Sequence, residues 1–342
     1  MGQVSILLLE SEDISWFRSE PGAARGAAAA LARRVGLDER RSGEVALAVS
    51  EAASNLVKHA VDGAILLRVV RTEHQAGVEF LAVDSGPGMA DVPEAMRDGM
   101  SSAGTLGIGL GSVARLADVF DVHSLPGRGT VIAARFWATR STGQQREPSV
   151  AGLTRAISGE QVCGDAWAAR IDEGSGPAAL LMLCDGLGHG PMAALAAAAA
   201  VQAFRSGRAR QPADVLDEIH RALRGTRGAA VAVARVEPDA GRLLYCGVGN
   251  VAAALIGDDT RSSPLSHPGI VGHRMPQLRT FEYPLPPGGA LVMHSDGLTD
   301  RWDPDSMPGL LRHLPVVVAG HLLRQAGVRR DDAGVLVAKG MW

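Results

Sequence analysis

Long apolar runs that end abruptly at a polar turn are the most distinctive pattern in this sequence. Residues 180–190 read LLMLCDGLGHG, an apolar stretch that stops at Asp185 and continues into a glycine-rich segment. An alanine-rich run follows at 192–204. This order predicts a buried strand, a tight turn and a packed helix.

The first half of the chain mixes strand and helix patterns. We predict strands at 4–9, 65–70 and 78–83, helices at 21–36, 38–60 and 112–117, and a closing hairpin of 119–123 with 130–136. In the second predicted helix, Glu51 and Asn55 are four residues apart and therefore share one face.

The second half contains more strands, and polar residues without periodicity precede it at 139–148. We predict a strand-like stretch at 157–168, strands at 228–236, 242–248, 251–256, 290–294 and 335–338, a helix at 212–223 and a loop or flap at 258–276. The polar seam is expected to be a linker between two domains.

Composition narrows the class of protein. The chain has 342 residues, 46% of them hydrophobic, and a net charge of −3, so we expect a globular protein without nucleic-acid or membrane partners. Its three cysteines show no CxxC spacing, which fits a reducing cytosol. The apolar segment 4–9 is too short for a signal peptide, and we expect a cytoplasmic location.

One helix and two glycine-rich segments carry the candidate chemistry of the first half. Glu51 could polarise a hydroxyl and Asn55 could bind Mg²⁺, although for this pair taken alone a polar stripe on an amphipathic helix is the better explanation. Asp84, which opens the turn DSGPG, could accept a hydrogen bond from an exocyclic amine. Residues 104–111 lead into a helix N-terminus, an arrangement that favours phosphate.

In order along the chain, these motifs resemble the GHKL (Bergerat-fold) ATPases over nearly all of residues 1–137. The likeness rests on Glu51 with Asn55, the Asp84 turn, the glycine-rich lid and Gly129-Thr130. Within that superfamily the chain is similar to anti-sigma-factor serine kinases, and more narrowly to the RsbT-like switch kinases of stressosomes. The resemblance implies a Bergerat α/β sandwich that binds ATP with Mg²⁺.

The resemblance also implies residue roles. Asn55 would hold Mg²⁺ between the phosphates, and Glu51 would activate the attacking serine hydroxyl. Asp84 would read the adenine amino group, with Thr130 beside it. Further nucleotide contacts would come from Gly86, Gly88, Gly104, Leu106, Gly107, Gly109 and Leu110. Thr105 departs from the pattern, because a second lid glycine is frequent there.

Four carboxylates of the second half each lie at the edge of a predicted strand: Asp165, Asp185, Asp296 and Asp331. A single Asp at a strand end is usually a turn former, but one converging site explains all four economically. Converging carboxylates repel one another and need cations, and the carbonyl of Gly186 is open to a ligand. We therefore expect two Mg²⁺ or Mn²⁺ ions and not zinc.

The arrangement of these acidic motifs resembles the PPM (protein phosphatase 2C) family, and especially its SpoIIE-type and RsbX-like serine phosphatases. The resemblance implies an α/β/β/α sandwich in which Asp185 is catalytic. It assigns the metal ligands to Asp165, Asp185, the carbonyl of Gly186, Asp296 and Asp331. Two departures are Cys163, in place of a glycine, and Gly334, where Thr or Ser is common.

The sequence thus predicts a two-domain α/β protein. Residues 1–138 would be the GHKL serine kinase-like domain, 139–150 the linker and 151–342 the PPM/SpoIIE-type phosphatase domain. A fusion of opposed enzymes suggests a bifunctional regulator of a partner-switching pathway, acting on a serine or threonine of a STAS-domain protein. A downstream PPM phosphatase and a sigma factor are further candidate partners.

Two alternatives remain open at this stage. In one, the first domain is an ATP-dependent anti-sigma or partner-binding module without transfer chemistry. In the other, it is a nucleotide sensor that regulates the phosphatase. Both keep the second domain as an active serine phosphatase.

Overall fold

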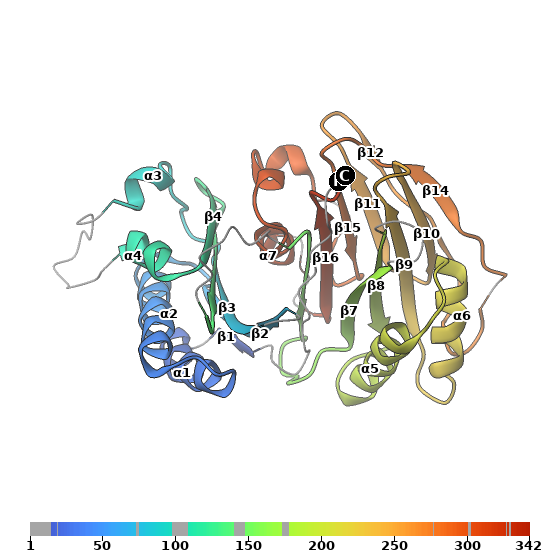
Figure 1. The fold of residues 1–342 in the computed structure, drawn as a ribbon, viewed down its shortest axis with the longest axis horizontal. Coiled ribbons are helices and arrows are strands. Elements are labelled where there is room, and N and C mark those ends of the chain that lie inside the picture. The colour runs from blue at the N-terminus through green and yellow to red at the C-terminus, as the bar shows by residue number, and fades with distance from the viewer. Residues whose placement is uncertain are drawn as a thin grey trace. The chain divides into compact units, whose positions relative to one another are not determined.

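The computed structural model describes residues 15–18, 20–72, 75–97, 109–139, 148–172, 178–275, 277–299, 302–325, 327 and 330–342. These residues divide into two compact units (Figure 1). The N-terminal unit comprises the described part of Leu7–Glu147 together with Pro304–Arg324. The C-terminal unit comprises Pro148–Asp303 and Gln325–Trp342.

The N-terminal unit is built on one five-stranded antiparallel sheet of order β1-β2-β3-β5-β4. Its strands are β1 (Ser15–Phe17), β2 (Ala64–Arg71), β3 (Ala76–Val83), β4 (Val119–Leu125) and β5 (Gly129–Trp137). Its helices are η2 (Pro21–Ala23), α1 (Ala24–Arg34), α2 (Glu39–His59), α3 (Val92–Ala95), α4 (Gly109–Leu116), η3 (Pro304–Ser306), η4 (Leu310–Arg312) and α7 (Pro315–Gln325).

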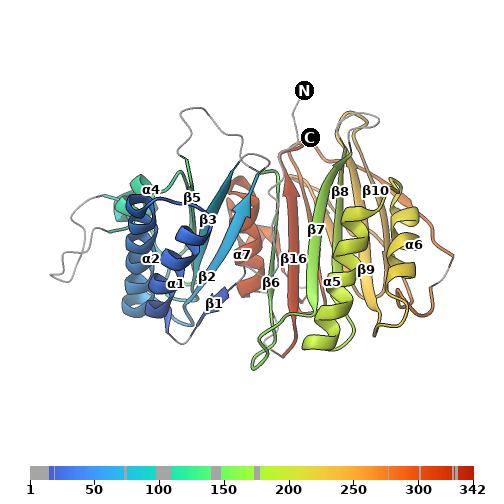
Figure 2. The same ribbon diagram turned by 60° about the horizontal axis from the view of Figure 1, so that its bottom comes forward.

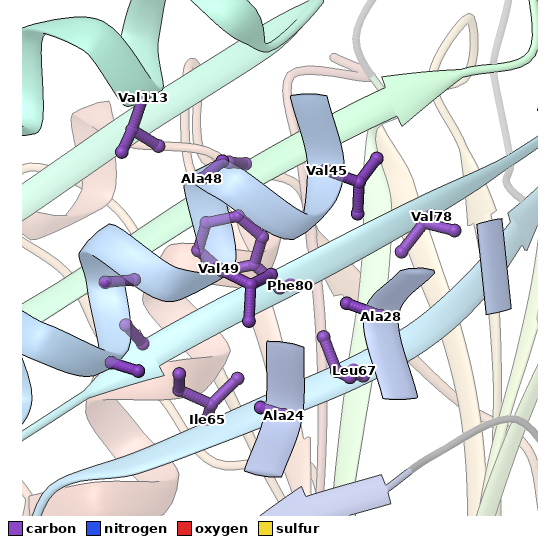
Figure 3. Packing of buried hydrophobic residues seen from close by; sticks show 14 of the residues in the cluster. Ala24, Ala28, Val45, Ala48, Val49, Ile65, Leu67, Val78, Phe80 and Val113 are labelled. Carbon is purple, nitrogen blue, oxygen red and sulfur yellow. The ribbon is translucent and has the colours of Figure 1, made fainter. Parts of the chain in front are cut away.

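Small and β-branched side chains pack α1, α2 and α4 against one face of this sheet (Figure 3). Alanines of α1 allow that helix to lie close to the strands, while Phe80 fills the centre of the layer. The packed residues include Ala24, Ala28, Val45, Ala48, Val49, Ile65, Leu67, Val78, Phe80 and Val113. Since side chains alternate along a strand, Leu81 and Val131 belong to the opposite face, which α7 covers.

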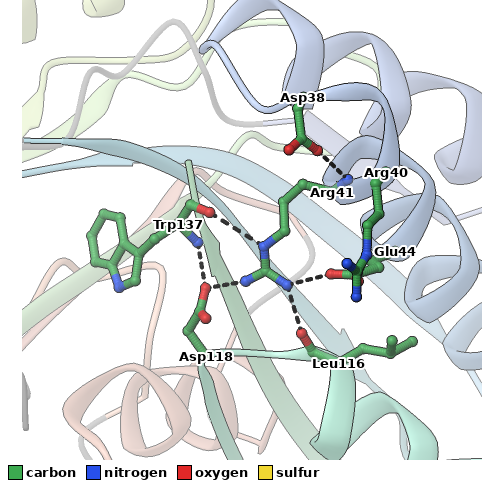
Figure 4. A network of polar contacts seen from close by, with 7 residues as sticks. All are labelled: Asp38, Arg40, Arg41, Glu44, Leu116, Asp118 and Trp137. Carbon is green, nitrogen blue, oxygen red and sulfur yellow. Dashed lines mark hydrogen bonds and ion pairs between the residues drawn. The ribbon is translucent and has the colours of Figure 1, made fainter. Parts of the chain in front are cut away.

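Arg41 ties the start of α2 to the edge of the sheet (Figure 4). Its guanidinium donates to Asp118, Glu44 and the carbonyls of Leu116 and Trp137. The side chain is buried, so these partners satisfy a charge that would otherwise be costly to desolvate. The network fixes α2, the helix that carries Glu51 and Asn55.

In its described residues, the C-terminal unit contains two sheets and two helices, which Figure 2 shows from a second side. One sheet has the order β13-β10-β9-β8-β7, with β14 added on β10, and the other has the order β12-β11-β15-β16-β6. The strands are β6 (Val150–Arg155), β7 (Asp165–Asp172), β8 (Ala178–Gly186), β9 (Ala229–Glu237), β10 (Arg242–Val248), β11 (Ala252–Ile256), β12 (Arg261–Ser262), β13 (Ser266–His267), β14 (Phe281–Pro284), β15 (Ala290–His294) and β16 (Ala333–Lys339). The helices are α5 (Pro191–Ser206) and α6 (Pro212–Ala222).

Alternation of side chains divides the core of this unit into two layers. Leu181 and Leu183 point into the layer between the sheets, together with Leu291 and Met293 from β15. Leu180 and Met182 point to the other face of β8, where the alanine-rich helix α5 and α6 cover the sheet. The expected two-domain α/β organisation, with a two-sheet sandwich in the second half, is confirmed.

Most expected elements are present, but three differences matter. The stretch 157–168 is not one strand, because residues 157–164 form a loop before β7 begins at Asp165. Helix α7 and strand β6 were not predicted. Residues 304–324 cluster with the N-terminal unit, although they lie within the predicted range 151–342.

Two expectations concern residues that the structure does not describe: the strand at 4–9 and most of the linker, 140–147. None of the helices in the described ranges combines the length and the apolar character needed to span a membrane.

Candidate active sites

The turn after β3 is held tightly by its own side chains and by the β4–β5 hairpin. Asp84 Oδ1 accepts a hydrogen bond from the Gly86 amide at 2.7 Å, and the Asp84 amide donates to the Thr130 carbonyl at 3.0 Å. Gly88 has a positive φ of 68°, and a Cβ there would collide with the Leu125 carbonyl. Only glycine fits this position.

Helix α2 approaches the same turn. A side chain at Gly86 would meet the carbonyl oxygen of His59, the last residue of α2. Glu51, Asn55 and His59 are spaced by four residues and therefore lie along one face of the helix. Glu51 and Asn55 are both partly exposed. The C-terminal end of α2 therefore lies against the Asp84 turn, and a joint role of Glu51, Asn55 and Asp84 stays a prediction.

Thr130, on β5, lies beside the Asp84 turn. Its hydroxyl is 2.8 Å from Ser124 Oγ, which also accepts the Met89 amide at 2.7 Å. These contacts connect β4, β5 and the end of the glycine turn. The predicted neighbourhood of Asp84 and Thr130 is therefore present in the structure.

The predicted lid is only partly described. Gly104, Leu106 and Gly107 lie outside the described residues, whereas Gly109 and Leu110 form the start of α4. Leu110 is buried against the helical layer, and Gly109 has a positive φ of 72°. The nucleotide contacts expected of these five residues remain predictions.

Asp84 is an electrostatically perturbed group of this region. Burial raises its pKa, while the Gly86 amide and then the charge of Arg324 act in the opposite direction. Arg324 comes from α7, and its Nη1 donates to Ser85 Oγ at 3.3 Å. The predicted adenine-reading residue thus has a cationic neighbour that the sequence pattern did not indicate.

Four strand ends converge in the C-terminal unit. Asp165 opens β7 directly across from Asp185 near the end of β8, because the two are register partners in the antiparallel pair. The residues after β15 and before β16 bring Asp296 and Asp331 from the other sheet. The charges of these four carboxylates act on one another, so the structure brings the predicted set together.

Ser295 links the two sheets at this point. Its hydroxyl donates to Asp165 Oδ2 at 2.6 Å and accepts the Gly334 amide at 2.9 Å. A Cβ at Gly334 would lie only 3.1 Å from Asp165 Cβ, so a larger residue would press on the carboxylate. The glycine that departs from the family pattern therefore suits this close packing.

The adjacent carboxylates Asp331 and Asp332 have different surroundings. Asp332 is buried, and its two oxygens accept the amides of Ile157 and Gly164, each at 2.7 Å. Asp331 is partly exposed, and its charge raises the pKa values of Asp185 and Asp296. This difference favours Asp331 as a ligand, whereas Asp332 anchors the loop before β7.

Burial, followed by repulsion among the carboxylates, dominates the electrostatics of the C-terminal site. Burial raises the pKa of Asp185 to about 7, and the charges of Asp296 and Asp331 add to the effect. Asp185 and Asp296 are also hydrogen-bonded to each other. Two carboxyl groups in contact require a shared proton or a cation between them.

The donor set fits a hard divalent cation, because every candidate side chain offers oxygen. Among the described residues, no three Asp, Glu, His or Cys side chains already stand close enough to hold a metal ion. One oxygen of Asp165 accepts a hydrogen bond from Ser295, and Asp185 lies close to Asp296. A divalent cation at this point would offset the mutual repulsion of Asp185 and Asp296.

Two functional neighbours were not predicted. Asn250 Nδ2 donates to Asp296 Oδ2 at 2.5 Å, and Ser295 orients Asp165. Asn250 precedes the predicted strand 251–256, and Ser295 precedes the predicted ligand Asp296, but the sequence patterns assign neither side chain a role. Their contacts cross between segments that are far apart in sequence, so no local pattern could assign them.

Two family descriptions match the chain. The histidine kinase-like ATPase domain matches residues 19–136, and stage II sporulation protein E (SpoIIE) matches residues 175–339. The chain belongs to the histidine kinase-like ATPases through its first part and carries a SpoIIE phosphatase domain in its second. It is a kinase–phosphatase fusion.

Particular relatives agree with this class. Over 115 residues the chain is 36% identical to the serine/threonine-protein kinase RsbT of Bacillus subtilis, covering 34% of this chain and 86% of RsbT. Over 157 residues it is 24% identical to the phosphoserine phosphatase RsbX of the same organism, covering 46% of this chain and 74% of RsbX.

Solved structures resemble the chain as well. One, from work on the bacterial stressosome as a modular system for secondary messenger signalling, is 34% identical and covers 56% of this chain and 98% of that chain, with a TM-score of 0.49. RsbX in complex with magnesium is 21% identical and covers 56% of this chain and 94% of that chain, with a TM-score of 0.46.

Proposed function

We propose that this protein sets the phosphorylation state of a serine or threonine on a STAS-domain partner, phosphorylating it with one unit and dephosphorylating it with the other. The supporting observation is that one chain joins an RsbT-like kinase domain to a SpoIIE phosphatase domain, with candidate functional groups present in both. Relatives of both kinds support a role in partner-switching regulation.

In the kinase direction, Asp84 would accept a hydrogen bond from the adenine amino group, and the amide oxygen of Asn55 would hold Mg²⁺. Glu51 would accept the proton of the attacking hydroxyl. The hydroxyl oxygen bonds to the γ-phosphorus, the bond between that phosphorus and the β–γ bridging oxygen breaks, and ADP leaves.

In the phosphatase direction, Asp165, Asp185, Asp296, Asp331 and the carbonyl of Gly186 would hold two Mg²⁺ or Mn²⁺ ions. Bound divalent cations would supply Lewis-acid chemistry for hydrolysis of a phosphate monoester. Ser295 holds one oxygen of Asp165, and Asn250 holds one oxygen of Asp296. Water supplies the new oxygen on phosphorus, and its proton passes to the departing serine oxygen.

A two-stage labelling experiment tests both directions. The variant Asp185→Asn is incubated with γ-labelled ATP, Mg²⁺ and STAS-domain proteins from the same genome, and wild-type protein with Mn²⁺ is then added. We expect label to accumulate on a STAS-domain serine or threonine and to be released in the second stage. Label that accumulates but resists the wild-type protein would contradict the phosphatase assignment.

Matched substitutions on α2 identify the kinase chemistry. In the Asp185→Asn background, Glu51→Gln should abolish labelling, whereas Glu39→Gln, at the exposed start of the same helix, should leave it intact. If neither the Asp185→Asn protein nor its Glu39→Gln derivative labels a partner, although both bind ATP, the kinase assignment would be wrong. The N-terminal unit would then be a partner-binding module or a nucleotide sensor.

A further inference from the structure

The segment Pro304–Arg324 is a structural part of the N-terminal unit, although the chain reaches it only after Asp296 and leaves it before Asp331. Its helix α7 is buried from Pro315 to Leu323. The phosphatase half of the sequence therefore contributes a helix to the kinase unit.

Strand β4 holds the beginning of α7. Asp121 Oδ1 lies 2.7 Å from His313 Nδ1, and Asp121 Oδ2 accepts the Leu314 amide at 2.7 Å. The carboxylate thus satisfies an amide at the helix start, where backbone donors lack partners within the helix. Further along, a Cβ at Gly320 would lie 3.0 Å from Val131 Cγ1, so α7 packs closely on β5.

A directed chain of hydrogen bonds runs along the end of α7. Arg324 can only donate, so its Nη2, at 3.3 Å, donates to His321 Nδ1. His321 therefore carries its proton on Nε2 and donates to His123 Nδ1 at 2.8 Å. His123 Nε2 in turn donates to the Pro308 carbonyl at 3.2 Å.

These contacts fix the position of the Arg324 guanidinium. One nitrogen is committed to His321, and another, Nη1, donates to Ser85 Oγ at 3.3 Å. Ser85 follows Asp84 directly, and the charges of Asp84 and Arg324 act on each other. The cation is therefore held beside the turn that would receive adenine.

We propose that Arg324 is a positioning residue of the nucleotide site: it holds the Asp84–Ser85 turn in place and stabilises the Asp84 carboxylate for adenine recognition. The inference rests on the proposed function, because it takes Asp84 as the group that reads adenine. It adds that ATP binding by the kinase unit depends on a residue supplied by the phosphatase half of the sequence.

The test measures ATP binding to the full chain with Mg²⁺ by titration calorimetry. Arg324→Gln should weaken ATP binding about tenfold, the effect expected when an opposite charge is removed from beside a carboxylate. Arg324→Lys should restore much of the affinity, because it keeps the charge. Arg312→Gln, which removes an exposed arginine from the same segment, should bind like the wild type.

Two readouts separate positioning from general structural support. Arg324→Gln should raise the KM for ATP in protein phosphorylation while leaving kcat nearly unchanged, because the guanidinium lies by the Asp84 turn and not on the Glu51 face of α2. On acidification, the ATP affinity of Arg324→Gln should begin to fall at a higher pH than that of the wild type. The charge of Arg324 lowers the pKa of Asp84, so without it this carboxylate is protonated at a higher pH.

Ser85→Ala provides a second variant that leaves α7 unchanged. It removes one hydrogen-bond partner of Arg324 at an exposed position, and we expect a smaller loss of ATP affinity. Wild-type affinity in both Arg324→Gln and Ser85→Ala, with Asp84→Asn defective, would overturn this inference alone. Equal ATP affinity in wild type and Asp84→Asn would overturn the proposed nucleotide site, and this inference with it.

Discussion

Ser295 shows how a single hydroxyl can organise a group of like charges. It donates to Asp165 and accepts the amide of Gly334, so it connects one sheet of the C-terminal unit to the other. Asp165 is buried, and the charge of Asp185 adds to the effect of burial in raising its pKa. The hydroxyl opposes this effect by stabilising the ionised form.

We expect Ser295→Ala to reduce Mn²⁺ affinity or phosphatase activity about 10–100-fold, the usual effect of removing a group that orients a metal ligand. Phosphate release should be measured as a function of Mn²⁺ concentration. Ser262→Ala, at an exposed position of the same unit, is the matched control. An unchanged Mn²⁺ dependence in Ser295→Ala would show that Asp165 does not need the hydroxyl.

At the scale of elements, α7 is the least expected part of the fold. Residues 315–323 are buried throughout, so they lack the polar face that usually reveals a surface helix. Its fixed position depends on β4, whose Asp121 and His123 point to the same face of the sheet. None of these pairings has a local sequence signal, because about 200 residues separate the partners.

The docking of α7 should weaken in acid. Burial lowers the pKa of His321 to about 3, whereas histidine in an unfolded chain titrates near 6.5. Below about pH 6.5 the unfolded state binds a proton that the folded state excludes, so stability is lost progressively as the pH falls toward 3. The groups facing His321 are His123, His313 and Arg324, with Asp121 beside His313.

Hydrogen exchange measured by mass spectrometry tests this expectation. Peptides covering 314–325 should lose protection between pH 7 and pH 5, after correction for intrinsic exchange rates, while peptides of α1 should not. His321→Gln keeps a donor near His123 without a titrating ring and should reduce the difference. Equal protection of α7 at both pH values would show that the histidine chain does not control its docking.

At the scale of the whole molecule, two chemically opposed domains share structural elements. The N-terminal unit is completed by Pro304–Arg324, and the chain then returns to supply Asp331 and β16 to the C-terminal unit. The sequence-based boundaries of 1–138 and 151–342 describe where the family motifs lie. Relative to those boundaries, the segment Pro304–Arg324 belongs to the N-terminal compact unit and not to the C-terminal one.

This sharing predicts that the two parts of a cut chain remain associated. A protease site is introduced between residues 139 and 148, and the cleaved protein is analysed by size-exclusion chromatography at micromolar concentration. We expect the fragments to elute together, because α7 remains docked on the N-terminal sheet. Separation of the wild-type fragments would contradict the prediction.

Gly320→Leu is the informative variant for that experiment. Its first added carbon, the Cβ, would lie 3.0 Å from a methyl group of Val131 and 3.3 Å from one of Leu81, and the rest of the side chain would press on them further. The cleaved variant should therefore separate more readily than the cleaved wild type. The melting temperature of the uncut variant serves as the control for overall folding.

The two-part organisation and most helices and strands were predictable from the sequence, which also nominates the candidate chemical groups. This is possible because apolar periodicity and glycine-rich turns are local, and because Asp84, Asp185 and Asp296 each end an apolar run. The same locality explains the misread stretch 157–168, where distant Asp332 holds a loop in place.

Which groups meet follows from the folded chain and not from the sequence patterns. The fold paired Asp165 with Ser295, distinguished Asp331 from Asp332, and placed Arg324 beside the Asp84 turn. These contacts depend on how distant strands and helices pack, and packing is set by the burial of whole faces rather than by neighbouring residues. The type of each side chain can be read from the sequence, but its contacts depend on the burial of apolar surface between segments that are far apart in the chain.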